Sequence, residues 1–225
     1  YKIKTLFKEL LIDFTNEYRA TKDYSDENIS YALTIHEGDS IPGFPSVDAF
    51  FYLLKPELEK LRDPIFDCLN DTYNYMENLS YKLVDRTFFK FPMIITTVKD
   101  LIIEFLQDQK EKCRYIIESL VDMHINYLFT NDYEYLHNFT TFIPKAQDNT
   151  KIDTKNIFVR EVRNRIEAYF KLILKNLRDE VPKAIGTFLV RGITDNIQLH
   201  LYNRIYQGNE LLEALNESDD IAKRR

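Results

Sequence analysis

The chain has 225 residues, of which 44% are hydrophobic and 29% charged, a composition typical of a soluble, folded protein. A chain of this length buries a sizeable core without disulfides or metals, and its formal net charge of -6 argues against a general nucleic-acid binder. We expect no secretory signal peptide, and the sequence has no run of ~18 apolar residues that could span a bilayer.

Cysteine and glycine are both scarce. The two cysteines, Cys68 and Cys113, lie far apart in apolar helical patterns, so we expect buried, reduced thiols and a reducing compartment. The chain has only 5 glycines, together with 7 prolines, and a sequence this poor in glycine forms few tight turns. We therefore expect a few long helices.

The first long helix is predicted over residues 1–20, where apolar side chains recur every three or four residues. The polar stretch that follows contains two glycines and two prolines, so we expect irregular structure there, with a short helix at DENISYALTI.

The second long helix is predicted over residues 46–85, with Ser46 as its N-cap. Two prolines interrupt the pattern. Pro56 falls near the helix start, whereas Pro64 is more interior and predicts a kink.

The second half of the chain predicts two more long helices, over residues 92–128 and 156–207, joined by a polar loop at 139–156. Pro182 lies in the interior of the last one, where a proline costs ~3 kcal/mol. The apolar stripe continues in phase across it, which favours one kinked but continuous helix. A short amphipathic tail ends the chain. Together these elements predict an all-α fold, an elongated antiparallel four-helix bundle forming a single domain over 1–225.

Catalytic motifs are missing from the sequence. It contains no GxxxxGK[ST] phosphate loop, no GxGxxG and no HExxH. Glu134 and His137 form one Glu-x-x-His pair, whereas a di-iron bundle needs two such pairs. We therefore expect no catalytic, cofactor-binding or metal-binding residues, and a protein that is not an enzyme but works through its surfaces, by assembly.

Three blocks of sequence resemble the stalk of dynamin-family large GTPases. Residues 49–68 are similar to the family's middle-domain pattern, with a L-x-x-L-x-x-P run that ends at Pro64. FFKFPMIITTV and residues 120–136 are similar to the patterns that begin and end the next stalk helix. The most specific block resembles the GTPase effector domain signature SYF-x-I-V-x-x-x-x-x-D-x-V-P-K-x-I. Its matching residues are Tyr169, Phe170, Asp179, Val181, Pro182, Lys183 and Ile185.

The resemblance implies how the chain is organised. Residues 1–138 correspond to the middle-domain part and 157–225 to the GTPase-effector part. Loop 139–156 stands where the family places its membrane-binding insert. The GTPase head, with its GTP and Mg, would precede Tyr1, so we expect the chain to be a piece of a larger GTPase. The family's glycine-rich GGAR-type loop is missing after the first helix.

The resemblance also implies a function. Stalks of this family pair through an apolar central contact and link into helical filaments that remodel or divide membranes. The expected partner is therefore the chain itself, as dimer, tetramer or filament, with membrane lipid reached indirectly through the insert or loop 139–156. The expected location is cytoplasmic, peripheral on membranes. Candidate self-assembly residues are Met123, Tyr127, Thr187, Tyr202 and Ile205. The alternative for each is simple core packing.

Two rival functions remain open. The chain could be a helical-bundle membrane scaffold or adaptor without a GTPase head. Such scaffolds carry basic stripes, and the last helix has Arg160, Arg163, Arg165, Lys171 and Lys175, although the net charge is acidic. It could also be the stalk of an Mx-type antiviral GTPase, which shares the fold but not the role in membrane division.

Overall fold

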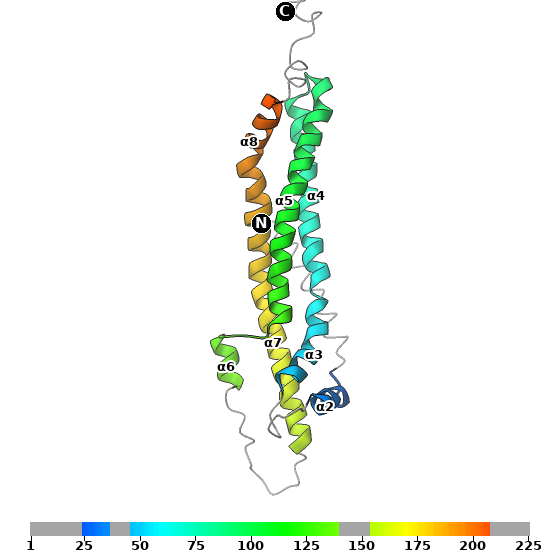
Figure 1. Ribbon diagram of the computed structural model, residues 1–225, viewed down its shortest axis with the longest axis vertical. Coiled ribbons are helices and arrows are strands. Elements are labelled where there is room, and N and C mark those ends of the chain that lie inside the picture. Colours follow the sequence, from blue (N-terminus) through cyan, green and yellow to red (C-terminus); the bar gives the residue numbers. More distant parts are fainter. Residues whose placement is uncertain (1–23, 37–45, 140–153, 208–225) are drawn as a thin grey trace, which may run out of the picture. The chain divides into compact units, whose positions relative to one another are not determined.

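The structure is a computed structural model that describes residues 24–36, 46–139 and 154–207 (Figure 1). Within these ranges every regular element is a helix and no strand occurs, which confirms the all-α class. In chain order the elements are α2 (Asp26–Ile35), α3 (Val47–Glu59), α4 (Arg62–Thr87), α5 (Pro92–Asn126), α6 (Tyr133–Phe139), α7 (Thr154–Ala184), the π-helix η1 (Ile185–Arg191) and α8 (Gly192–Gln207).

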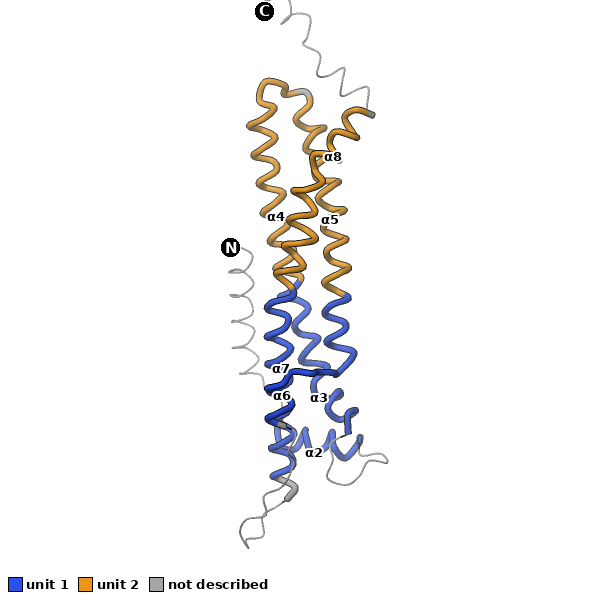
Figure 2. The backbone as a smooth tube through the Cα atoms, turned by 90° about the vertical axis from the view of Figure 1, so that its left-hand side faces the viewer, with its two compact units in different colours: residues 1–65, 119–180 blue, residues 66–118, 181–225 orange. Residues whose placement is uncertain are grey.

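The chain divides into two compact units (Figure 2). The first comprises Tyr1–Ile65 and Ser119–Glu180, and the second comprises Phe66–Glu118 and Val181–Arg225. The predicted helix at 1–20, the amphipathic tail and most of loop 139–156 lie outside the described residues. The elongated antiparallel four-helix arrangement and the single domain stay predictions.

Two serine caps set the starts of α2 and α3. The Ser25 hydroxyl accepts a hydrogen bond from the Asn28 amide at 3.1 Å, and the Ser46 hydroxyl accepts one from the Ala49 amide at 3.0 Å. Each cap satisfies an amide of the first turn that has no partner within the helix. The predicted short helix at DENISYALTI and the predicted N-cap at Ser46 are therefore confirmed.

The helix predicted over 46–85 is two helices in the structure. The chain leaves α3 after Glu59 and enters α4 at Arg62. Pro64 stands in the first turn of α4, and because it has no amide hydrogen it cannot bond the carbonyl one turn earlier. The predicted kink within one helix is wrong, since the interruption is a break between two helices. Pro56 lies well inside α3 rather than near its start.

The helix predicted over 156–207 is continuous, as expected. Pro182 lies inside α7, and the chain passes through η1 into α8 without leaving a helical conformation. Seven of these residues form a π-helix, a wider form that the sequence pattern did not predict and that is rare in proteins. The kink at Pro182 stays a prediction.

The core of each unit consists of the apolar stripes that the sequence indicated. In the first unit the buried side chains include Leu54, Leu58, Leu61, Ile65, Ile125, Val162, Ile166 and Phe170. In the second unit they include Leu69, Val98, Ile102, Cys113, Ile117 and Ile185, and the structure adds Leu106 and Leu189, which the predicted stripes did not contain. A few stripe residues are instead exposed, namely Leu79, Leu83 and Phe188. Helical periodicity therefore identified the core faces but not every buried position.

Candidate assembly surfaces

The end of α5 in the first unit carries a cluster of exposed apolar side chains. Met123 is 64% exposed, Tyr127 is 72% exposed and Phe129 is 62% exposed. Val121 and Ile125 of the same turns are buried, so the two faces of the helix end are sharply different. The rings of Tyr127 and Phe129 lie 6.2 Å apart. We call Met123, Tyr127 and Phe129 the α5-end cluster.

Tyr169 on α7 fixes the backbone of this cluster. Its hydroxyl accepts a hydrogen bond from the Phe129 amide at 3.1 Å and lies 3.4 Å from the Phe129 carbonyl oxygen, to which it donates. The Tyr135 ring packs edge-on against the Tyr169 ring, with centroids 5.6 Å apart. Burial raises the pKa of Tyr169 above its ordinary value and raises the pKa of Tyr135 to about 12, so both phenols keep their protons. Tyr169 was singled out only as a signature residue, and no spacing pattern indicated this contact.

The residues on either side of Met123 make polar contacts within the first unit. Asp122 forms an ion pair with Arg62, which also pairs with Glu59 at 2.5 Å. His124 Nε2 lies 2.9 Å from a Glu180 carboxylate oxygen. These contacts tie the end of α5 to the start of α4 and the end of α7, while Met123 itself projects outward.

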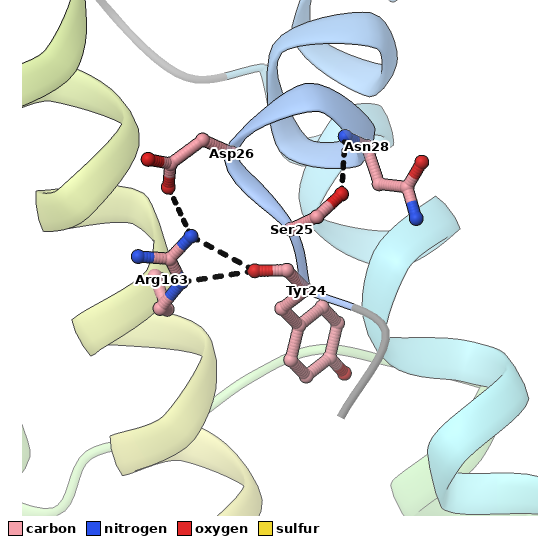
Figure 3. A network of polar contacts seen from close by, with 5 residues as sticks. All are labelled: Tyr24, Ser25, Asp26, Asn28 and Arg163. Atoms are coloured by element: carbon pink, nitrogen blue, oxygen red, sulfur yellow. Dashed lines mark hydrogen bonds and ion pairs between the residues drawn. The ribbon is translucent and has the colours of Figure 1, made fainter. Parts of the chain in front are cut away.

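Arg163 on α7 holds the start of α2 (Figure 3). Its guanidinium donates two hydrogen bonds to the Tyr24 carbonyl, at 3.0 and 2.8 Å, and pairs with the Asp26 carboxylate. The Tyr24 hydroxyl in turn donates to the Leu53 carbonyl at 3.2 Å. Arg163 is therefore part of the fold rather than of an open basic stripe.

The basic stripe proposed for a membrane scaffold is thus smaller than the sequence suggested. Besides Arg163, Arg165 is also occupied within the unit, because it pairs with Glu161 at 3.0 Å. Arg160, Lys171 and Lys175 remain exposed.

In the second unit, Thr187 is exposed on η1 and borders a surface cavity of about 600 Å³. The cavity also touches Gln109, Tyr115 and Phe188. Gly192 brings the start of α8 close to α5, since a Cβ on it would lie 2.8 Å from the Gln109 side-chain oxygen.

The other two candidates of the second unit lie on α8. Tyr202 is 62% exposed and its ring stacks on Tyr206 at 5.7 Å, whereas Ile205 is half-buried. Nearby, His200 stacks on Phe105 at 4.6 Å and Arg204 pairs with Glu104 at 2.5 Å, which attaches α8 to α5. The structure therefore places Met123 and Tyr127 together in the first unit, and Thr187, Tyr202 and Ile205 in the second.

The remaining signature residues divide by burial. Phe170 and Tyr169 are buried, Pro64 and Pro182 are half-buried, and Asp179 and Lys183 are exposed. The described histidine, cysteine and acidic side chains nowhere gather in groups of three that could hold a metal ion. Within the same residues, each helix is too short or too polar to cross a bilayer.

Residues 1–143 match the dynamin central region, and residues 154–225 match the dynamin GTPase effector domain. The chain belongs to the dynamin family. The two matched regions are those of the family's stalk, and Met123 and Tyr127 fall in the first, whereas Thr187, Tyr202 and Ile205 fall in the second.

The relatives of this dynamin-family chain include Mx proteins and dynamin-1-like proteins. The interferon-induced GTP-binding protein Mx of Ctenopharyngodon idella is 25% identical over 204 residues, which cover 89% of this chain and 31% of that protein. The dynamin-1-like protein of Caenorhabditis elegans is 36% identical over 93 residues, covering 39% of this chain and 12% of that protein. The dynamin-1-like protein of Mus musculus is 39% identical over 64 residues, covering 28% and 9%. The chain therefore spans about a third or less of the length of these relatives.

Proposed function

We propose that this chain is the self-assembly stalk of a dynamin-like GTPase and that it joins copies of itself into dimers and helical filaments that remodel or divide membranes. The observation that carries the proposal is the α5-end cluster, whose three apolar side chains are each more than 60% exposed. Exposed, contiguous apolar side chains are typical of protein interfaces, where Met and aromatic residues are enriched.

The cluster is suited to rigid association because its backbone is held before a partner arrives. The Tyr169 hydroxyl holds Phe129, and ion pairs or hydrogen bonds hold Asp122 and His124 on both sides of Met123. A surface that is ordered in the free protein loses less conformational entropy on binding. Thr187, Tyr202 and Ile205 of the second unit are proposed to form further contacts between copies.

The membrane part of the proposal rests on family membership. GTP and Mg would bind in a GTPase head, and lipid would be reached through the insert or through loop 139–156. The protein would act in the cytoplasm, peripherally on membranes. A role as an Mx-type antiviral stalk is the second candidate, because the Mx protein aligns with 89% of this chain whereas the dynamin-1-like proteins align with 39% or less.

The decisive experiment measures self-association by sedimentation velocity over a range of concentrations. Met123→Asp places a charge in the apolar contact and is expected to weaken dimerisation by about 30-fold or more, the effect of an interface hot spot. Val47→Asp is the matched control, because Val47 is 72% exposed in the same unit and lies outside the α5-end cluster. A wild-type chain that stays monomeric, or a Met123→Asp chain that associates like the wild type, would contradict the proposal.

A further inference from the structure

A row of three cations lies on the exposed face of α7. Lys171, Lys175 and Arg178 are all exposed, whereas Phe170, Ile173 and Leu177 on the opposite face are buried. Residues spaced by four and three positions share one face of a helix, so the three cations are neighbours. We call them the basic row.

The basic row brings together three cations that are neighbours on one helix face and have no acidic partner among the described residues. Among the described residues, many other cations have an acidic partner; these include Lys60, Arg62, Lys99, Lys112, Arg163, Arg165 and Arg204. None of the three side chains of the basic row forms an ion pair with a described residue. Although the formal net charge of the protein is -6, these three adjacent cations are available to bind an acidic partner beyond the described residues.

A matching row of opposite charge lies on α4. Asp67 and Asp71 are exposed, four positions apart, and neither forms an ion pair with a described residue. No lysine or arginine occurs between Arg62 and Lys82, so this stretch of α4 contributes no cation of its own beside the two carboxylates. We call Asp67 and Asp71 the acidic row.

We propose that the basic row of one copy docks on the acidic row of a second copy. Lys171 and Lys175 are four residues apart, as are Asp67 and Asp71, so each pair spans ~6 Å along its helix and the charges meet in register. Arg178 extends the basic row by one further turn. The contact rests on the proposed self-assembly, but it uses other residues and other forces than the α5-end cluster.

This contact complements the apolar one. Because it joins two different surfaces, it can repeat from one copy to the next, whereas a contact between identical surfaces closes on itself as a dimer. Exposed ion pairs are individually weak and are screened by salt, so the basic and acidic rows would act as a salt-sensitive link and set the register between copies.

A second copy suits the basic row better than an anionic membrane does. The complementary charge is present on the chain itself, at the same spacing. An anionic lipid surface would attract the basic row but repel the acidic row and the net charge of -6. The partner that these charges favour is therefore another copy of this chain.

Charge reversal tests the proposal in the full chain. We expect Lys171→Glu with Lys175→Glu to weaken the association of dimers into larger species roughly tenfold at low salt, and Asp67→Lys with Asp71→Lys to do the same. When all four substitutions are combined, the two rows exchange their charges and attract each other again. Association is then expected to return to near the wild-type level. High salt is expected to weaken the wild type to the level of each reversed pair.

Matched controls separate the rows from the net charge. Lys82→Glu with Lys90→Glu changes the net charge as much as reversing the basic row, and Asp100→Lys with Glu118→Lys as much as reversing the acidic row. All four control residues are exposed and lie outside both rows. If these controls weaken association as much as the row variants do, the effect belongs to net charge and the proposal is wrong.

The outcomes also distinguish this proposal from the proposed function. A wild-type chain that is monomeric contradicts self-assembly itself. A chain that dimerises through Met123 but whose larger species are insensitive to salt and to both reversals contradicts only the contact between the rows. If Lys171→Glu with Lys175→Glu leaves self-association unchanged but abolishes binding to phosphatidylserine vesicles, the occupant is a lipid surface and the proposal is overturned.

Discussion

Arg163 shows how much one side chain contributes to the placement of α2. Its side chain is three-quarters buried, and its guanidinium reaches both the Tyr24 carbonyl and the Asp26 carboxylate, so it satisfies the backbone that leads into the helix. The Ser25 cap acts on the same turn from within the helix. A short helix of ten residues is marginal by itself, and it depends on such contacts for its stability.

Arg163→Ala is expected to lower the free energy of unfolding by about 2 kcal/mol, because it removes charge-assisted hydrogen bonds and leaves the Tyr24 carbonyl without its donor. Urea unfolding measures the loss, and hydrogen exchange of the α2 amides shows whether it is local. Arg160→Ala, on the same helix but exposed, is the control and is expected to change stability by less than ~0.5 kcal/mol. Equal losses in both variants would contradict the role assigned to Arg163.

At the scale of elements, η1 is where the structure departs most from an ordinary helix. Seven residues adopt the wider π form directly after Pro182 and Ala184, and Ile185 and Leu189 still reach the core. The buried Cys113 thiol of α5 lies 3.9 Å from the Ala184 carbonyl. Two of the few glycines of the chain belong to this region, but their surroundings differ.

Gly186→Ala and Gly192→Ala are expected to have different effects. A Cβ on Gly186 meets no atom within 4 Å, so alanine should raise stability by about 0.5–1 kcal/mol through its higher helix propensity. A Cβ on Gly192 would lie 2.8 Å from the Gln109 side-chain oxygen, so the Gln109 side-chain amide must move. The cost of this movement should cancel the stability gained from the helix propensity of alanine. Urea unfolding of the two variants decides, and an equal gain in both would show that α8 does not depend on this close approach.

At the scale of the whole molecule, the buried ionisable groups make stability depend on pH in the alkaline range. Burial raises the pKa of the Cys68 and Cys113 thiols from 9.0 to about 12, and the pKa of the Tyr135 phenol from 10.0 to about 12. The charge of Asp71 adds to the shift at Cys68. These groups occur in both compact units, so both are affected.

We expect the free energy of unfolding to fall as the pH rises from about 9 towards 12. In that range the unfolded chain releases the thiol protons while the folded chain retains them, so each pH increment favours unfolding; below pH 9 the contribution is constant. Urea unfolding at several pH values measures the slope. Cys113→Ala should make the decline shallower, and an unchanged slope in that variant would contradict the assignment to the buried thiols.

The sequence by itself determined most of the described helices, the cap at Ser46, most core positions and the family. These features depend on residues that are close in the chain: helical periodicity repeats within a few residues, and a cap acts over a single turn. The effector-domain signature around Pro182 is likewise one continuous stretch, and the match over 154–225 confirms what it indicated. The break before Pro64 was predicted as a kink within one helix, because one missing amide can bend a helix or end it and the pattern alone does not distinguish the two.

Only the tertiary structure decided which side chains are available to a partner. Arg163 and Lys171 look alike in the sequence, but Arg163 bonds Tyr24, 139 positions away, whereas Lys171 stays exposed. Tyr127 and Tyr169 are both aromatic residues in helical patterns, yet one is 72% exposed and the other holds the backbone of Phe129, 40 positions away. The physical reason is the same in each case. A side chain is exposed or occupied according to partners that the fold brings from distant parts of the chain, and local spacing carries no information about them.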